Sequence, residues 1–120
     1  MRVAVLTLTR DRLAYTQHCF SRLRELAGCD YDHFVLDQAS TDGTVDWLYS
    51  EEAGIHAVVE MPENIGIWRG FNVLVWNARV SGYDVFVTFD NDCELLTDGA
   101  LRDVCQAALD EDMALSPRIL

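Results

Sequence analysis

Two carboxylates stand two positions apart in the segment Asp90-Asn91-Asp92, directly after the apolar run 85–89. Acidic side chains with this spacing at a strand end can converge on one hard cation such as Mg²⁺ or Mn²⁺, with water and phosphate oxygens as further ligands. Such a cation would neutralise a diphosphate that an acidic chain otherwise repels. The alternative is that both acids only cap the loop that follows, as Asp often does.

A second polar segment covers residues 37–44 and reads Asp-Gln-Ala-Ser-Thr-Asp-Gly-Thr. An acid at a strand end can accept hydrogen bonds from a ribose hydroxyl or a base N–H, so we expect Asp37 to contact a ligand. Ser40, Thr41 and Asp42 are typical of turns and helix N-termini. We therefore interpret Asp42 as a helix cap.

A third segment, residues 64–72, reads Asn-Ile-Gly-Ile-Trp-Arg-Gly-Phe-Asn. It places Asn64 and Gly66 directly before a predicted helix, whose free N–H groups favour an anion. Arg69 follows within the first turn and could assist in binding a phosphate. A glycine-containing segment of this kind is weak evidence when taken alone.

The elements that must position these segments alternate along the chain. Short apolar, β-branched runs predict strands at 3–8, 34–37, 56–60 and 85–89, with the start of a fifth at 113–115. Helical spacing and stop signals predict helices at 13–27, 44–53, 68–80 and 98–109. This order predicts an α/β, Rossmann-like, mainly parallel sheet with helices on both faces. All the polar segments follow strands, where such folds bind ligands.

The composition narrows the function further. The 120 residues suit one domain, and half of them are hydrophobic, which excludes a disordered chain. Nine basic residues, all Arg, face 20 acidic ones for a net charge of −11. This charge disfavours nucleic acid and anionic membranes as partners, and the absence of Lys excludes amine chemistry.

Cellular context is predicted from what the chain lacks. No apolar run approaches the roughly 20 residues that a membrane span needs, and the N-terminus shows no cleavable signal pattern. The four cysteines include no CxxC pair, so we expect reduced thiols and no zinc site. We therefore expect a cytoplasmic protein without a membrane span.

Taken together and in order, these segments resemble the nucleotide-sugar-binding, N-terminal half of the family-two inverting glycosyltransferases of the GT-A fold. The resemblance covers essentially the whole chain, including the closing residues 116–120, which look like the exit of the family's fifth strand. The segments that carry it are Thr9-Arg10, residues 37–44, Asn64-Ile-Gly66 with Gly70-Phe-Asn72, and the DxD motif in 89–92.

The resemblance implies a role for each matching position of the donor pocket. Thr9, Arg10 and Asp37 would line the nucleoside pocket, with Asp37 facing the base. Asn64 and Arg69 would lie beside the nucleotide. The large Trp-Arg pair at 68–69 stands where related members often have small residues, so we expect a narrower or differently charged pocket.

The resemblance also implies a metal cofactor and a reaction. Asp92 would ligate Mn²⁺ or Mg²⁺, and Asp90 would reach the ribose or a metal-bound water. The donor would be a nucleoside-diphosphate sugar, and the acceptor a saccharide or other hydroxyl compound that attacks the anomeric carbon with inversion.

One departure concerns the length of the chain. Residues 1–120 read as a single nucleotide-diphospho-sugar-binding domain that lacks the family's acceptor-binding half and its general base. Glu94, near the DxD motif, is a weak candidate for that base. We therefore expect donor binding with little or no transfer by this chain alone, and self-association through exposed apolar surface is a further hypothesis.

Other function classes fit less well. A non-catalytic nucleotide-sugar-binding or interaction module derived from the same fold stays open as the alternative. A receiver domain would need a Lys that the chain lacks. A phosphatase of the haloacid dehalogenase class would carry its Asp-x-Asp motif at the start of the domain, whereas here it begins at residue 90 of 120.

Overall fold

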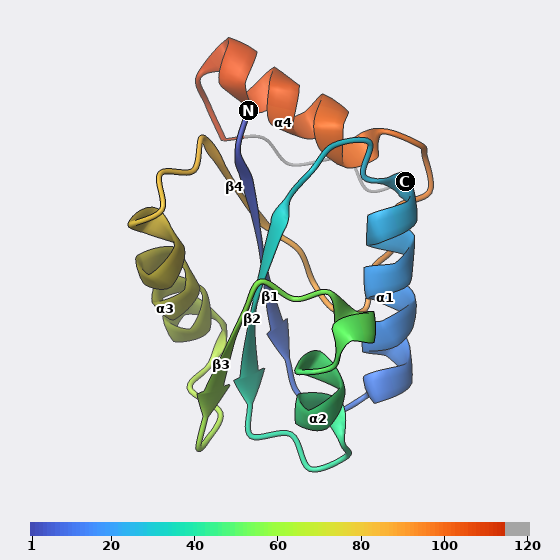
Figure 1. Cartoon of the computed structure of the whole chain (residues 1–120). Coiled ribbons are helices and arrows are strands. Elements are labelled where there is room, and N and C mark those ends of the chain that lie inside the picture. The colour runs from blue at the N-terminus through green and yellow to red at the C-terminus, as the bar shows by residue number, and fades with distance from the viewer. Residues whose placement is uncertain (115–120) are drawn as a thin grey trace.

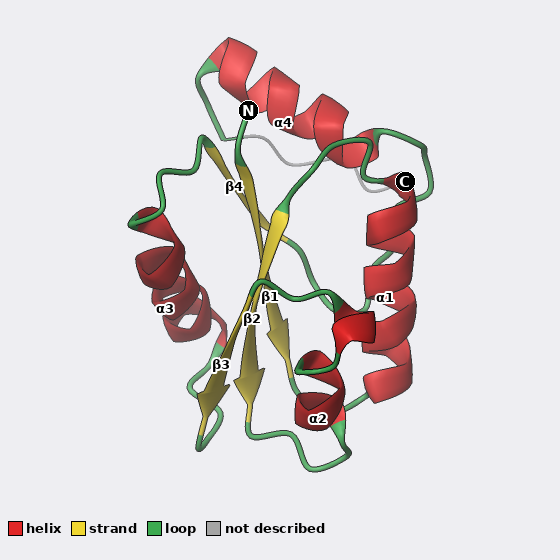
Figure 2. Cartoon of the chain, in the orientation of Figure 1, coloured by secondary structure: helices red, strands yellow, loops and turns green. Residues whose placement is uncertain are grey.

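The computed structural model describes residues 1–114, which form one parallel sheet with helices on both faces (Figures 1 and 2). The sheet has the strand order β3-β2-β1-β4, and every neighbouring pair is parallel. The strands are β1 (Val3–Thr9), β2 (Asp32–Gln38), β3 (Ala57–Met61) and β4 (Val85–Thr88). The predicted Rossmann-like α/β architecture is therefore confirmed.

The helices divide between the two faces of the sheet. Figure 1 shows α3 on one face, whereas α1, α2 and α4 lie on the other. Their bounds are α1 (Leu13–Leu26), α2 (Thr44–Leu48), α3 (Ile67–Arg79) and α4 (Ala100–Glu111), with a 3₁₀ turn η1 (Glu51–Ala53). None of the described helices is long and apolar enough to cross a membrane.

The central strand β1 is buried on both of its faces, which explains its continuous apolar run. Ala4 and Leu6 pack against the α3 side. Val3 and Val5 pack with α1 and α4 on the opposite side. Because side chains alternate along a strand, one short segment contributes to both layers of the core.

A buried histidine also lies in the sheet. His33 on β2 is only 3% exposed, and its Nε2 lies 2.9 Å from the Thr7 hydroxyl. Its ring packs 4.4 Å from that of Phe20. Burial lowers the pKa of His33 to about 3, so the imidazole is neutral in the folded protein.

The predicted helix at 44–53 is wrong in its extent. The α-helix α2 ends at Leu48, and the separate turn η1 begins at Glu51. Ser50 between them has an extended backbone (φ −75°, ψ 155°), and its hydroxyl donates to the Trp47 carbonyl oxygen at 2.6 Å. A serine that satisfies a helix carbonyl in this way competes with continuation of the helix.

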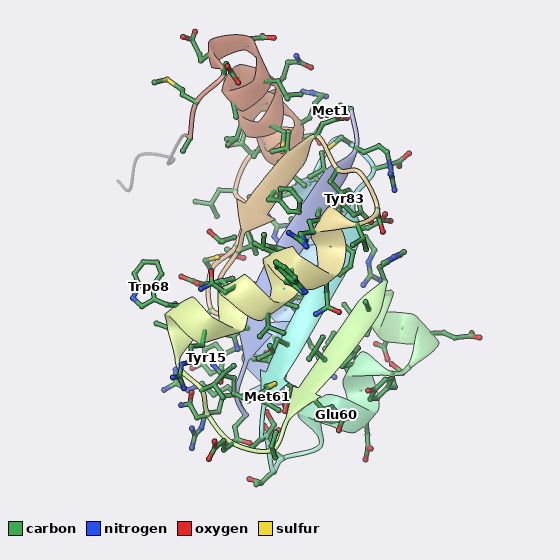
Figure 3. All side chains as sticks on the ribbon, turned by 90° about the vertical axis from the view of Figure 1, so that its left-hand side faces the viewer. Met1, Tyr15, Glu60, Met61, Trp68 and Tyr83 are labelled. Carbon is green, nitrogen blue, oxygen red and sulfur yellow. The ribbon has the colours of Figure 1, made fainter. Side chains whose placement is uncertain are left out.

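The large side chain of Trp76 lies outside the core. The buried positions of α3 are Gly70, Leu74 and Ala78, whereas Trp76 is 64% exposed. The Arg79 guanidinium lies 3.3 Å from the centre of the Trp76 ring, so a cation–π contact covers part of its exposed face. Trp68 is 83% exposed, and Figure 3 shows it projecting from the start of α3 away from the sheet.

The C-terminal part departs from prediction in two further places. The last helix begins at Ala100 rather than at residue 98, after Gly99 in the left-handed region. Met113 and Ala114 are not in a strand, so the predicted fifth strand does not begin there. Its remaining residue, Leu115, and the segment 116–120 lie outside the described residues.

Candidate functional site

The site lies where the order of the sheet reverses. The chain passes from β1 to β2 and β3 on one side, and then returns through α3 to β4 on the other side of β1. Ligands of open α/β sheets bind outside the carboxyl ends of the strands at such a switch point. Pairing of β4 with β1 reaches Leu6, whose carbonyl also accepts from Phe89 N, whereas β1 runs on to Thr9. The chain after β4 thus leaves β1 before β1 ends.

The segment that follows β4, Asp90-Asn91-Asp92, is here called the acidic turn, and it is attached to α1. Asn91 Nδ2 donates to the hydroxyl of Thr16 at 3.1 Å, and Thr16 is fully buried. The Asp90 carbonyl oxygen lies 3.3 Å from the sulfur of Cys19 on α1 and 3.0 Å from that of Cys93. The middle residue and the backbone of the turn are therefore held inward.

The two carboxylates of the acidic turn are exposed. Within residues 1–114, neither the Asp90 nor the Asp92 carboxylate accepts a hydrogen bond or pairs with an arginine, so the capping alternative finds no support there. The same residues contain no group of three or more His, Cys, Asp or Glu side chains placed to hold a metal. Two free carboxylates suit a cation whose other ligands are water and phosphate, rather than a cage of protein groups alone.

Asp37, at the end of β2, is 1% exposed, and both of its oxygens are occupied. Oδ1 accepts from the Thr9 hydroxyl at 2.7 Å and from the Ser40 hydroxyl at 2.6 Å. Oδ2 accepts from the Ser40 backbone N–H at 2.9 Å. The buried hydrogen bond from Thr9 to Asp37 therefore joins the ends of β1 and β2. A direct contact of Asp37 with a base stays a prediction.

The loops after β1 and β2 are joined by a second set of bonds. Asp11 N donates to the Ser40 hydroxyl at 2.7 Å, and the Asp11 carboxylate accepts from Thr41 N at 2.6 Å. Asp11, Arg12 and Ala39 all have positive φ values, between 53° and 57°. Strained residues that cluster at one rim of a sheet are typical of functional loops.

Asp42 accepts hydrogen bonds from the first residues of two helices, α1 and α2. Its carboxylate accepts from the backbone N–H and hydroxyl of Thr44 at the start of α2, and from Leu13 N at the start of α1. The bond from the Thr44 hydroxyl is the main reason that the pKa of Asp42 lies below its usual value. Gly43, not Asp42, holds the N-cap position of α2. The Asp42 carboxylate still accepts from the first backbone N–H of both helices.

The loop before α3 is ordered by two amide side chains. Asn64 Oδ1 accepts from Gly66 N at 2.9 Å. Gln38, buried at the end of β2, accepts from Ile65 N at 2.7 Å and donates to the Gly66 carbonyl at 3.2 Å. As predicted, Asn64 and Gly66 directly precede the helix, which begins at residue 67.

Two arginines stand on this rim. Arg10 follows β1, and Arg69 lies in the first turn of α3; both are exposed. The helix start lies close to the end of β1, since a Cβ placed on Gly70 would come within 2.8 Å of the Leu8 side chain. Within the described part of the chain, neither guanidinium forms an ion pair, so both are available to an anion.

Glu94 is less available than the acids of the acidic turn. Its carboxylate lies 2.7 Å from His18 Nε2 and 3.6 Å from Arg22 Nε, both on α1. This pairing disfavours Glu94 as a free general base.

Several contacts at the site were not predicted. Thr16 was not singled out, although a polar residue on the buried side of a predicted helix is a usable signal. No local pattern identifies the partners of Asn91, Gln38 and Asp11, because each contact joins positions at least 25 residues apart.

Comparison with known proteins decides the family. The sequence profile described as Glycosyl transferase family 2 matches residues 4–118. The chain belongs to this family. No curated protein matches its sequence.

Solved structures agree with the family-2 fold. A mannosyltransferase, PcManGT from Pyrobaculum calidifontis, in complex with GDP-Man and Mn²⁺, superimposes with a TM-score of 0.74 at 20% identity, over 88% of this chain and 32% of that one. S. aureus TarS superimposes with a TM-score of 0.72 at 21% identity, over 92% of this chain and 20% of that one. TarS 1–349 in complex with UDP-GlcNAc superimposes with a TM-score of 0.73 at 19% identity, over 92% of this chain and 32% of that one. This family-2 chain thus spans a fifth to a third of the solved chains it resembles.

Proposed function

We propose that this family-2 domain binds a nucleoside-diphosphate sugar through Mn²⁺ or Mg²⁺, for inverting transfer of the sugar to an acceptor hydroxyl. The observation that carries the proposal is the acidic turn. It presents two unpaired carboxylates beside the switch point of the sheet, while Asn91 and the Asp90 carbonyl anchor it to α1. The Mn²⁺ and GDP-Man in the PcManGT structure support the same interpretation.

The residues of the acidic turn fit the proposed cation. Asp92 would be its protein ligand, and Asp90 would serve as a second ligand or reach the ribose. A bound divalent cation would neutralise the diphosphate and stabilise it as a leaving group. Both protein groups are oxygen donors, which is the ligand type that Mg²⁺ and Mn²⁺ take.

The remaining rim residues would bind and orient the donor. Arg10 and Arg69 are unpaired cations and would contact the diphosphate. Asn64 shapes the loop in front of α3, whose N-terminal N–H groups favour an anion. Because Asp37 is buried and saturated, its role in the nucleoside pocket would be to hold Thr9 and Ser40 in place.

The acceptor side of the reaction is not assigned to residues 1–114. Inversion requires the acceptor hydroxyl to attack the anomeric carbon from the side opposite the diphosphate, with a base that takes its proton. Glu94 is paired with His18 and Arg22, so we assign no base among residues 1–114. We propose that residues 1–120 form the donor-binding domain and that the acceptor site lies outside it.

Calorimetric titration tests donor binding. Uridine, guanosine and thymidine diphosphates would be titrated into the chain with Mn²⁺ and with a chelator. We expect at least one of them to bind with Mn²⁺, and roughly tenfold or greater loss of affinity on chelation or in Asp92→Asn. Asp98→Asn, a matched change of an exposed acid outside the acidic turn, should bind as the wild type does. Affinity that survives both chelation and Asp92→Asn would overturn the metal assignment.

A second candidate, a binding module without transferase activity, is favoured by the pairing of Glu94. Turnover separates the two: release of nucleoside diphosphate that depends on an added hydroxyl acceptor identifies an enzyme, whereas binding without release identifies a module.

Self-association is proposed for both candidate functions, because four large apolar side chains are each more than 60% exposed: Trp68, Trp76, Val80 and Leu96. Light scattering should show a dimer or larger species, and a monomer at high concentration would contradict this.

A further inference from the structure

Two thiols on different elements meet beneath the acidic turn. Cys19 lies on α1 and is 1% exposed, whereas Cys93 directly follows the turn and is exposed. Their sulfurs lie 3.3 and 3.0 Å from the same oxygen, the carbonyl of Asp90. Because both sulfurs approach one oxygen at hydrogen-bond distance, the two thiol groups are neighbours in the fold. Neither residue takes part in the proposed binding of the donor.

We propose that Cys19 and Cys93 form a reversible disulfide site, which a low-molecular-weight disulfide such as oxidised glutathione oxidises. A disulfide needs two side chains that approach closely. Two thiols that share one hydrogen-bond acceptor, the Asp90 carbonyl oxygen, meet that need. The difference in exposure sets the order of events. Cys93 can meet a dissolved disulfide, whereas Cys19 is reached only from Cys93.

The reaction proceeds in two balanced exchanges. The deprotonated Cys93 sulfur attacks one sulfur of oxidised glutathione, so that the glutathione S–S bond breaks, a mixed disulfide forms and one glutathione thiolate leaves. The deprotonated Cys19 sulfur then attacks the Cys93 sulfur and displaces the second glutathione thiolate. The two protons of the protein thiols end on the two glutathiones. The protein loses two electrons, and these reduce one glutathione disulfide to two thiols.

The bond would change the acidic turn, and this consequence rests on the proposed function. Two bonded sulfurs lie closer together than two thiols that share one acceptor, so Cys93 and the adjacent Asp92 would move toward α1. The Asp90 carbonyl would also lose both of its thiol donors. Because metal ligands must be placed within a few tenths of an ångström, we expect oxidation to weaken Mn²⁺ binding about fivefold or more.

The sequence offers a clean way to locate the bond. Trypsin cleaves only after arginine here, because the chain has no lysine, and the four cysteines fall on four different peptides: 13–22, 25–69, 80–102 and 103–118. The full chain would be equilibrated with oxidised glutathione, alkylated and digested. We expect the whole chain to lose two hydrogens without retaining glutathione, and peptide 13–22 to be linked to 80–102.

Matched variants complete this test. Cys93→Ser changes an exposed side chain and should abolish the link, whereas Cys29→Ser should leave it intact. Cys29 and Cys105 contact one hydrophobic cluster and provide the rival pair. A link between their peptides 25–69 and 103–118 in its place, or glutathione that stays on Cys93, would overturn the proposal.

Binding of Mn²⁺, followed by electron paramagnetic resonance on the reduced and oxidised forms, tests the consequence for the acidic turn. Equal affinity in both forms would overturn that part of the proposal. A reduced chain that binds no Mn²⁺ at all would contradict the proposed function, while the peptide map would still decide whether the disulfide site exists.

Discussion

Asn91 in the middle of the acidic turn donates a 3.1 Å hydrogen bond to the hydroxyl of Thr16, a fully buried residue of α1. The bond joins the end of β4 to the helix that follows β1, and so it spans the switch point of the sheet. With Asn91 held inward, the carboxylates on either side of it stay exposed. The geometry of the proposed donor site would thus depend on a residue that touches neither the metal nor the nucleotide.

Asn91→Ala should therefore weaken Mn²⁺ binding without unfolding the protein. One lost hydrogen bond of about 1 kcal/mol corresponds to roughly a fivefold lower affinity. Calorimetric Mn²⁺ titration and thermal unfolding would be compared with Asn77→Ala, which removes an amide bonded to a carbonyl of its own helix, α3. Equal effects of the two variants on Mn²⁺ binding would contradict the positioning role of Asn91.

The two rim arginines should affect the nucleotide but not the metal. Arg10→Ala and Arg69→Ala each remove a cation proposed to contact the diphosphate, and the loss of one charge-assisted bond should cost roughly tenfold in nucleotide affinity. The affinity for Mn²⁺ in the absence of nucleotide should stay unchanged. Arg79→Ala, at the other end of α3, is the control and should bind nucleotide normally.

Stability should depend on pH through His33. The unfolded chain has a histidine pKa near 6.5, whereas burial lowers the folded value to about 3. Between these values the unfolded state binds one more proton, so stability falls as the pH falls, by about 1.4 kcal/mol per pH unit. His33→Gln should flatten this slope in denaturant unfolding, whereas the exposed His56→Gln should not. An unchanged slope in His33→Gln would show that another group is responsible.

Two glycines distinguish the stability cost of a steric clash from that of backbone strain. Gly28 and Gly43 both have positive φ values, 74° and 89°. A Cβ on Gly28 would lie 2.5 Å from the Gly99 backbone, where α1 meets the start of α4, whereas one on Gly43 would meet nothing within 4 Å. We expect Gly43→Ala to cost about 1 kcal/mol from strain alone and Gly28→Ala about 3 kcal/mol. Similar costs in urea unfolding would contradict the close approach of α1 to α4.

Local patterns were sufficient to predict the layers of this fold. The apolar runs of β1 and β2 are buried on both faces, and this is why the strands were recognisable and a parallel sheet was expected. Prediction failed where a local bond outweighed the pattern. The Ser50 hydroxyl interrupts the helix predicted at 44–53.

The site was predictable as a set of strand ends but not as a set of contacts. Because the carboxyl ends of parallel strands share one edge, Thr9, Asp37 and Asp90 could be assigned to that edge from the sequence. That Asp37 is saturated by Thr9 and Ser40 could not be foreseen. The same is true of the approach of Cys19 and Cys93 to one carbonyl oxygen, because only the folded chain brings residues so distant in sequence together.

The central claim is that Asp92 holds a divalent cation for a nucleoside diphosphate. The most direct measurement is a titration of Mn²⁺ into the chain, in which electron paramagnetic resonance records the free Mn²⁺. It is made with and without the nucleoside diphosphate that the chain binds. We predict that the wild-type chain takes up Mn²⁺ more tightly when the nucleotide is present, and that Asp92→Asn removes this gain while Asp98→Asn retains it. An Asp92→Asn chain that still takes up Mn²⁺ and nucleotide as tightly as the wild type would contradict the account.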